Sequence, residues 1–141
     1  MSVGAVVLVD TGPLVALFDP SDAEHARCKW ALARLRRSRR VTSLSVLTEA
    51  VYLLSFSSRA QRALLAFVAA GAVEIADFNA AQVSRAAALM ERFESLPMDF
   101  ADATLVVLAE HFQTTAVFTL DRRDFSVYRL GRRAFRLIPT Q

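Results

Sequence analysis

The feature that most constrains the fold is an unbroken apolar run that ends in a carboxylate, Val6-Val7-Leu8-Val9-Asp10. Such a run predicts a strand buried on both faces, which is typical of a parallel sheet. The following Thr11-Gly12-Pro13 predicts a tight turn and the immediate start of a helix. Because ligands of open α/β sheets bind beyond the carboxyl ends of the strands, we expect Asp10 to face a site. The alternative is that Asp10 only caps the helix.

Composition excludes several classes of protein. The chain has 141 residues, 54% of them hydrophobic, so we expect a single domain over residues 1–141 rather than disorder. No apolar run approaches the roughly 18 residues of a membrane span, and the start lacks a basic leader, so we expect a cytoplasmic protein with no membrane partner. Cys28 is the only cysteine, which excludes an intrachain disulfide. Four glycines and no Walker or dinucleotide pattern argue against a nucleotide cofactor.

Hydrophobic periodicity predicts the remaining elements. We expect helices over 22–37, 44–56, 58–70, 79–93 and 98–110, and strands over 41–43, 73–76, 116–119 and 134–138. In the first of these helices, Ala26, Trp30, Ala33 and Leu35 would form the apolar face. The order of elements predicts an α/β fold, a three-layer α/β/α sandwich with a mainly parallel central sheet of about five strands.

Three acids stand inside or at the start of predicted helices. Glu49 lies in an apolar setting where an unpaired charge is costly, so it needs either a salt bridge to an arginine or a role in a site. Asp99 and Asp102 are three residues apart in the first turn of the last long helix. We interpret Asp99 as its N-cap and Asp102 as functional, because Asp102 already lies inside the helix.

Two further acids follow the strand predicted over 116–119. Asp121 comes just after its carboxyl end and repeats the layout of Val9-Asp10. Asp124 follows three residues later, and we expect it to cap or orient a short helical turn rather than to act directly.

The net charge is +3, and its carriers are almost all arginines, because Lys29 is the only lysine. The arginines gather over 34–40 and over 122–136. They could form a basic rim for a polyanion, or they could be a solvated helix face or a consequence of genome composition.

Four short motifs in this order resemble the PIN domain family, and in particular the VapC-type toxins of bacterial toxin–antitoxin pairs. The motifs are Val9-Asp10-Thr11-Gly12-Pro13-Leu14-Val15-Ala16-Leu17, Leu47-Thr48-Glu49-Ala50, Asp102-Ala103 and Thr119-Leu120-Asp121-Arg122-Arg123-Asp124-Phe125. Together they span essentially the whole chain. The resemblance implies a PIN-like fold and a catalytic, metal-binding set of four acids, Asp10, Glu49, Asp102 and Asp121.

The resemblance also implies roles for other side chains. It places Thr11 and Thr119 as hydroxyls beside the acidic site, where Thr11 would position water or phosphate. His25 stands where many members of the family have a histidine, and we interpret it as structural or substrate-side rather than as a catalytic base.

The chemistry of four converging carboxylates supports a metal site independently. They repel one another, so some would take up protons unless a cation compensates them. Mg²⁺ or Mn²⁺ prefers oxygen ligands, whereas zinc prefers His or Cys. One or two such ions, held by Asp10 or Asp121, suit hydrolysis of a phosphodiester. The resemblance implies an endoribonuclease, and single-stranded RNA loops are favoured because an RNA helix hides its base edges.

The resemblance further implies a cognate antitoxin protein and a homodimer. The apolar helices over Leu47–Phe56 and Leu64–Val68 could form the partner groove or the dimer face, or they could simply be core. Two other functions stay open: a non-catalytic RNA-binding or scaffold module, and a PIN nuclease that processes RNA without being a toxin. A flap-type DNA nuclease is a weaker alternative, because the short chain has no room for a helical arch.

Overall fold

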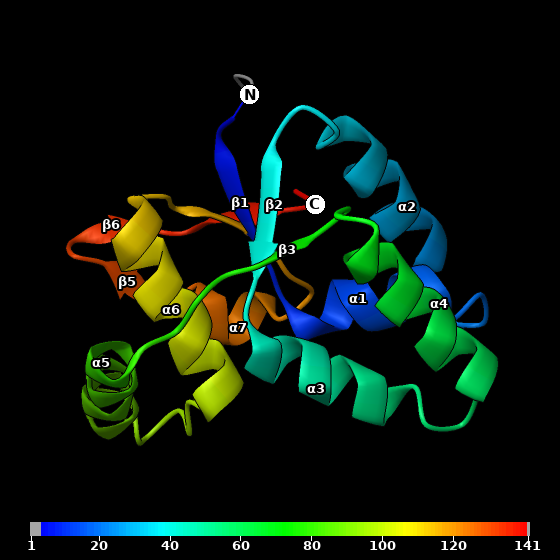
Figure 1. Ribbon diagram of the computed structural model, residues 1–141. Helices are drawn as coiled ribbons and strands as arrows, with labels where there is room; N and C mark the ends of the chain where they lie inside the picture. The colour runs from blue at the N-terminus through cyan, green and yellow to red at the C-terminus, as the bar shows by residue number, and fades with distance from the viewer. Residues whose placement is uncertain (1–3, 141) are drawn as a thin grey trace.

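A five-stranded, fully parallel sheet forms the centre of the computed structural model, which describes residues 4–140 (Figure 1). Its strands lie in the order β3-β2-β1-β4-β7. They are β3 (Glu74–Ile75), β2 (Arg39–Thr42), β1 (Val6–Val9), β4 (Ala116–Phe118) and β7 (Arg136–Ile138). The predicted parallel sheet of about five strands is confirmed.

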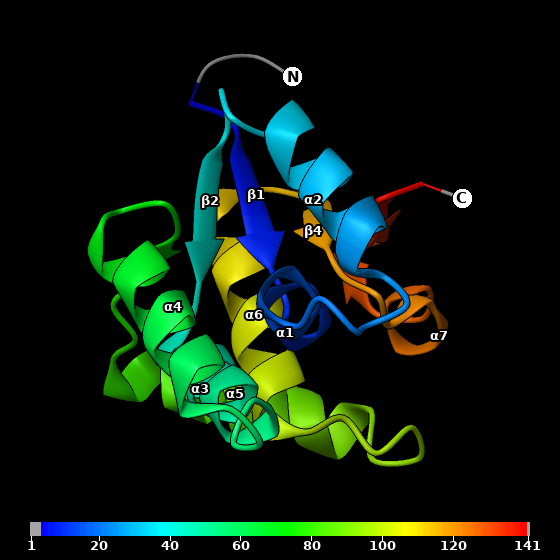
Figure 2. The ribbon, with the colours of Figure 1, turned by 90° about the vertical axis from the view of Figure 1, so that its right-hand side faces the viewer.

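Helices cover both faces of this sheet. They are α1 (Thr11–Phe18), α2 (His25–Arg34), α3 (Leu44–Leu53), α4 (Ser58–Ala69), α5 (Ala80–Arg92), α6 (Phe100–Phe112) and α7 (Arg122–Phe125). Figures 1 and 2 show α1, α2 and α4 on one face and α6 on the other, with α5 packed against the outside of α6. Helix α3 lies beyond the carboxyl ends of the strands and contacts both α1 and α6. The predicted three-layer sandwich is therefore confirmed.

The apolar run that begins the chain is the central strand. Leu8 of β1 is in register with Val41 of β2 on one side and with Val117 of β4 on the other. Val7, Leu8 and Val9 are all buried, as expected of a strand with helices above and below it. Only Val6, at the start of the run, is partly exposed. The other three side chains face helices on either side of the sheet, which explains why these positions carry no polar residue.

The order of the strands reverses beside β1. From β1 the chain builds outward through β2 to β3, and β4 and β7 then add to the other side of β1. The carboxyl ends of β1 and β4 therefore flank a topological switch point, where α/β folds place their ligands. Helix α6 ends just before β4 begins, so its first turn lies at the same edge of the sheet.

Helix α2 differs from its prediction in length and in its buried face. It begins at His25 and ends at Arg34, and it buries Cys28 and Ala31, with Leu35 beside its end. Trp30, expected in the core, is 62% exposed. The small side chains of Cys28 and Ala31 let α2 pack closely against the rest of the protein. The bulky indole of Trp30 on the buried face would prevent such close packing. Ala26 and Ala33 lie with Trp30 on the exposed side.

Near its end the chain forms a hairpin that the sequence analysis did not predict. Strands β5 (Arg129–Leu130) and β6 (Arg133–Ala134) pair antiparallel around Gly131, which has a φ of 60°. The strand expected over 134–138 is therefore divided between β6 and the edge strand β7.

Within residues 4–140, every helix is too short or too polar to span a membrane.

Candidate functional site

Asp10 lies at the carboxyl end of β1 and is held by three hydrogen bonds. Its backbone N–H donates to the carbonyl of Phe118 (2.9 Å), the last residue of β4. The N–H of Thr11 donates to Oδ1 (2.8 Å) and the hydroxyl of Thr119 donates to Oδ2 (2.7 Å). Asp10 thus does cap α1, as the alternative proposed, and it is also bound to the end of a second strand. It is 94% buried (6% exposed).

Thr119 connects two of the predicted acids. Its hydroxyl donates to Asp10 and accepts the backbone N–H of Asp121 (2.9 Å), and its side chain is fully buried. One hydroxyl therefore fixes the positions of the residues that follow β1 and β4.

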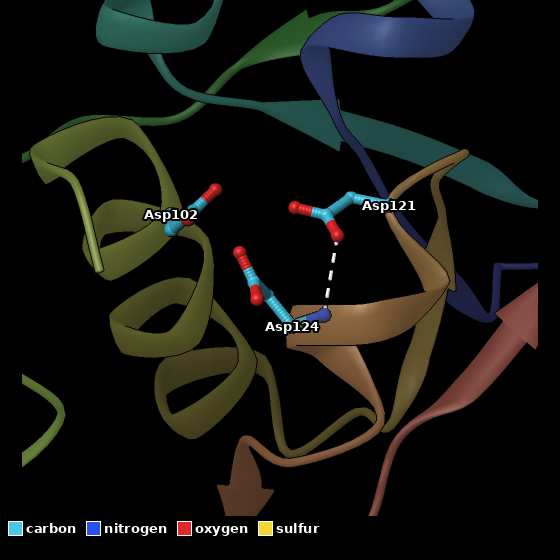
Figure 3. Close-up of side chains that lie close together, drawn as sticks. All are labelled: Asp102, Asp121 and Asp124. Carbon is cyan, nitrogen blue, oxygen red and sulfur yellow. Dashed lines mark hydrogen bonds between the residues drawn. The ribbon is translucent and has the colours of Figure 1, made fainter. Parts of the chain in front are cut away.

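Three carboxyl groups meet beyond these strand ends. One oxygen from each of Asp102, Asp121 and Asp124 lies within 4.8 Å of the others (Figure 3). The N–H of Asp124 donates to Oδ1 of Asp121 (3.1 Å), so Asp121 is the N-cap of α7. The expectation that Asp124 caps the short turn was wrong, because Asp121 caps it and the carboxyl group of Asp124 joins the cluster instead.

The first turn of α6 is arranged as predicted. Asp99 is its N-cap and accepts the N–H of Asp102 (2.8 Å). The side chain of Asp102 is thereby free of the capping role and points into the carboxyl cluster (Figure 3).

Glu49 lies on α3, half-buried and outside the three-carboxyl cluster. None of the residues 4–140 forms a salt bridge with it, so the arginine partner considered from the sequence is not found. Its negative charge contributes to the raised pKa of Asp10, which places it within electrostatic range of the site.

Tyr128 is a site residue that the sequence analysis missed. It is fully buried, and its hydroxyl donates to Oδ2 of Asp102 (3.1 Å). Its ring packs edge-on against Phe93 and Phe125, with centroids 5.2 and 5.1 Å away. No sequence pattern marks it, because an isolated tyrosine is an ordinary core residue and its partner lies on α6, a distant segment of the chain.

Burial and mutual repulsion make the acids of the site weak. Burial raises the pKa of Asp102 to about 8, and the charges of Asp99 and Asp10 add to the shift. Burial also raises the pKa of Asp10 to about 6, although its hydrogen bonds from Thr119 and Thr11 oppose the change. For Asp124, burial and then the charge of Asp121 raise the pKa. Full ionisation of these acids at neutral pH therefore needs a compensating positive charge, which the protein alone does not supply.

A hard divalent cation fits this set of side chains. The donors are carboxylate oxygens from the ends of β1 and β4 and from α6, the ligand type that Mg²⁺ and Mn²⁺ prefer. The hydroxyl of Thr11, next to Asp10, is buried and has no hydrogen-bond partner among the described residues. An unpartnered buried hydroxyl is costly, and a ligand or its water shell would satisfy it.

His25 has a structural position. Its Nδ1 lies 2.7 Å from the carbonyl oxygen of Ala16 and so ties the start of α2 to α1. The arginines of 34–40 do not form a rim around the acids, which was one of the alternatives considered for them. Arg39 and Arg40 begin β2, in register with Val6 and Val7, so this group lies at the opposite, amino end of the sheet.

Comparison with known proteins gives a family, a relative and two similar folds. The PIN domain family matches residues 7–130. Ribonuclease VapC26 of Mycobacterium tuberculosis is 34% identical over 136 residues, which cover 94% of this chain and 100% of the relative.

Two solved structures share the fold. VapC20 of Mycobacterium tuberculosis, a sarcin–ricin loop cleaving toxin, matches with a TM-score of 0.76 and 24% identity over 83% of this chain and 91% of that one. VapBC2 from Rickettsia felis, bound to a DNA fragment from its promoter, matches with a TM-score of 0.64 and 18% identity over 94% and 98% of the two chains. Both matches support the sandwich with its parallel sheet.

Proposed function

The chain belongs to the PIN domain family, and from this premise we propose that it is a metal-dependent endoribonuclease, the toxin of a toxin–antitoxin pair. The observation that carries the proposal is the group of mutually repelling carboxyl groups at the switch point of the sheet, of which Asp10 is buried and the other three are half-buried. A protein that only binds RNA gains nothing from such a costly arrangement. The full-length similarity to a protein named a ribonuclease supports the same function.

We assign the metal-binding role to Asp10, Asp102, Asp121 and Glu49, with Asp124 as a further candidate ligand. Asp102, Asp121 and Asp124 already approach one another closely enough to share an ion. A bound Mg²⁺ or Mn²⁺ would supply charge stabilisation at the phosphate and a water of lowered pKa. Asp10 would hold its carboxylate in a fixed orientation, because two donors already bind its oxygens.

The uncharged residues of the site would position the acids. Thr119 would keep Asp10 and the backbone of Asp121 at a fixed separation through its two hydrogen bonds. Tyr128 would orient Asp102 from within the aromatic core. Thr11 would offer its unpartnered hydroxyl to water or phosphate.

The substrate would be RNA, cleaved in a single-stranded loop where unstacked bases are accessible. The proposed partners are a cognate antitoxin and a second copy of the chain, and the proposed location is the cytoplasm. Of the two apolar segments considered from the sequence, Leu47, Leu54 and Leu64 are core. Tyr52 and Phe56 at the end of α3 are exposed and supply the apolar area that an interface needs.

The test is cleavage of a panel of structured RNAs with Mg²⁺, with Mn²⁺ and with a chelator. We compare the wild type with Asp10→Asn and Asp102→Asn, and with Asp77→Asn as a control on an exposed acid outside the cluster. The two site variants should lose at least about a hundredfold in rate, since each removes a ligand for the charge-stabilising ion. Asp77→Asn should cleave as the wild type does.

Three outcomes would contradict the proposal in whole or in part. RNA binding without any cleavage would favour the non-catalytic module. Cleavage that persists in the chelator and in both site variants would remove the acids from the mechanism. Cleavage without toxicity or an antitoxin would instead favour a PIN nuclease of RNA processing.

A further inference from the structure

One stretch of the chain carries strong positive charge that the catalytic proposal does not use. Residues 25–48 include seven basic side chains and no acidic one. The structure places the part over 34–40 at the amino ends of the strands, opposite the carboxyl cluster. The two ends of the sheet therefore differ in charge.

Some of these charges are compensated by the protein itself. Arg27 pairs with Glu24 (3.2 Å) and Arg39 pairs with Glu74 (2.7 Å). Arg40 donates to three backbone carbonyls. Lys29, Arg34, Arg36 and Arg37 form no salt bridge with any described residue. The partial negative charge at the C-terminus of α2 stabilises one basic side chain in or near its last turn, but it does not explain four of them.

Three of these four charges border two neighbouring hollows of about 330 Å³ each. Arg34, Arg36 and Arg37 line the first. Arg34 and Trp30 line the second, together with Pro139 and Thr140 beyond the end of β7. Because Arg34 lines both, the two hollows lie side by side.

Trp30 gives this surface a second kind of contact. Its indole is 62% exposed, and the guanidinium of Arg34 lies 4.8 Å from the ring centroid. An exposed aromatic ring among arginines is the combination with which proteins stack unpaired bases and hold the neighbouring phosphates. An acidic peptide would use the arginines but would leave the indole unused, and bases in a duplex are already stacked.

We propose that Trp30, Arg34, Arg36 and Arg37, the Trp30 surface, bind a single-stranded segment of RNA away from the cleaved bond. A base stacks on Trp30, and the phosphates that flank it lie on the three arginines. That this RNA is the substrate rests on the proposed function. The surface supplies attraction for a polyanion at a distance from the acidic site, so it should lower KM for long RNA and leave kcat unchanged.

The protein contains its own reporter for this contact, because Trp30 is the only tryptophan. An oligouridylate of eight nucleotides is titrated into the protein in a chelator, so that no cleavage takes place. The fluorescence of Trp30 should be quenched, and the affinity should fall as salt rises.

The test variant is the double substitution Arg36→Ala, Arg37→Ala, and its matched control is Arg59→Ala, Arg62→Ala on α4, where both side chains are exposed. The test variant should bind about tenfold more weakly, and its slope of log affinity against log salt should be smaller by about 1.4, for two lost phosphate contacts. The control should match the wild type. Circular dichroism confirms that both variants are folded.

Absence of quenching, or equal affinity of the test variant, would overturn the inference. Tighter binding of a duplex than of the single strand, or equal quenching by polyglutamate, would also overturn it. The proposed function is tested separately by cleavage. Asp102→Asn should still show quenching while it cleaves nothing, and a wild type that cleaves RNA without quenching would refute the Trp30 surface alone.

Discussion

The ionised carboxylate of Asp102 destabilises the folded protein, although the proposed metal site needs it. Its neighbours Asp99 and Asp10 repel its charge, and burial removes the water that would stabilise it. Among residues 4–140, the side chain that stabilises the charged form of Asp102 is Tyr128, whose hydroxyl donates a hydrogen bond of 3.1 Å to its carboxylate. The folded protein without metal therefore holds Asp102 partly protonated at neutral pH, whereas the unfolded chain does not.

This difference makes the stability of the metal-free protein depend on pH. Between the ordinary pKa of 3.8 and the folded value of about 8, the folded state binds more protons at Asp102 than the unfolded state does. The free energy of unfolding should therefore fall as pH rises through this range, and Asp10 adds to the fall up to about pH 6. Urea denaturation at pH 5 and pH 8 in a chelator measures it.

Asp102→Asn removes this titration, so the variant should be more stable than the wild type at pH 8 and should show a smaller dependence on pH. Added Mg²⁺ should stabilise the wild type at pH 8 and should have less effect on the variant. A wild type that is more stable at pH 8 than at pH 5 would contradict the raised pKa of Asp102.

Tyr128→Phe tests the hydrogen bond to Asp102 while it keeps the ring that packs on Phe93 and Phe125. Groups that orient metal ligands typically change metal affinity by 10–100-fold, so we expect about tenfold weaker Mg²⁺ binding with the fold preserved. The measurement is the Mg²⁺ dependence of the melting temperature and of cleavage. Tyr52→Phe, at a tyrosine that is 73% exposed, is the control. Equal Mg²⁺ dependence in all three proteins would show that Tyr128 has only a packing role.

At the scale of elements, α6 carries both core and site. Its first turn lies at the carboxyl edge of the sheet with Asp99 and Asp102, and most of its body is buried between the sheet and α5. The N-terminus of a helix has a partial positive charge, which favours acids in that turn. The same helix therefore anchors the core and presents an acid to the site.

Substitutions of Asp99 test whether this residue only caps α6 or also contributes its charge to cleavage. Asp99→Asn keeps an oxygen that can accept the N–H of Asp102, whereas Asp99→Ala removes it. We expect the alanine variant to lose about 1 kcal/mol of stability, and the asparagine variant to lose little. Urea denaturation at pH 7 measures both. If Asp99 is only a cap, Asp99→Asn also cleaves RNA at the wild-type rate, and a tenfold loss would place its charge in the chemistry.

At the scale of the whole molecule, the fold separates its charges. The acids follow the carboxyl ends of β1 and β4, and the arginines of 34–40 lie at the amino ends. Because parallel strands bring like ends together, residues far apart in sequence are gathered at the same edge. The buried residues of the sheet and its flanking helices form one continuous hydrophobic cluster.

From this cluster we propose that residues 1–141 fold as one domain and unfold in one transition. Trp30 reports on α2 by its fluorescence, and far-ultraviolet circular dichroism reports on all the helices. The two urea curves should coincide. A separate earlier transition in fluorescence would mean that α2 detaches before the rest of the fold is lost.

Local patterns were enough to predict the sheet and the positions of two acids at its carboxyl edge, Asp10 and Asp102. The apolar run that ends at Asp10 predicted a buried parallel strand with an acid at the switch point, and the spacing of Asp99 and Asp102 separated the cap from the acid that points into the carboxyl cluster. The helix predicted over 79–93 likewise forms, and Asn79 and Gln82 make a capping box at its start. These features depend on backbone geometry within a few residues, and so the sequence by itself determined them.

Contacts between distant segments were decided only by the tertiary structure. The sequence could not show that Tyr128 donates to Asp102, that Asp124 joins the carboxyl cluster or that Trp30 stays exposed. Each depends on how closely α2, α6 and α7 approach the sheet and one another. That approach is set by the packing of the whole core, because close-packed side chains fix distances that no local pattern encodes.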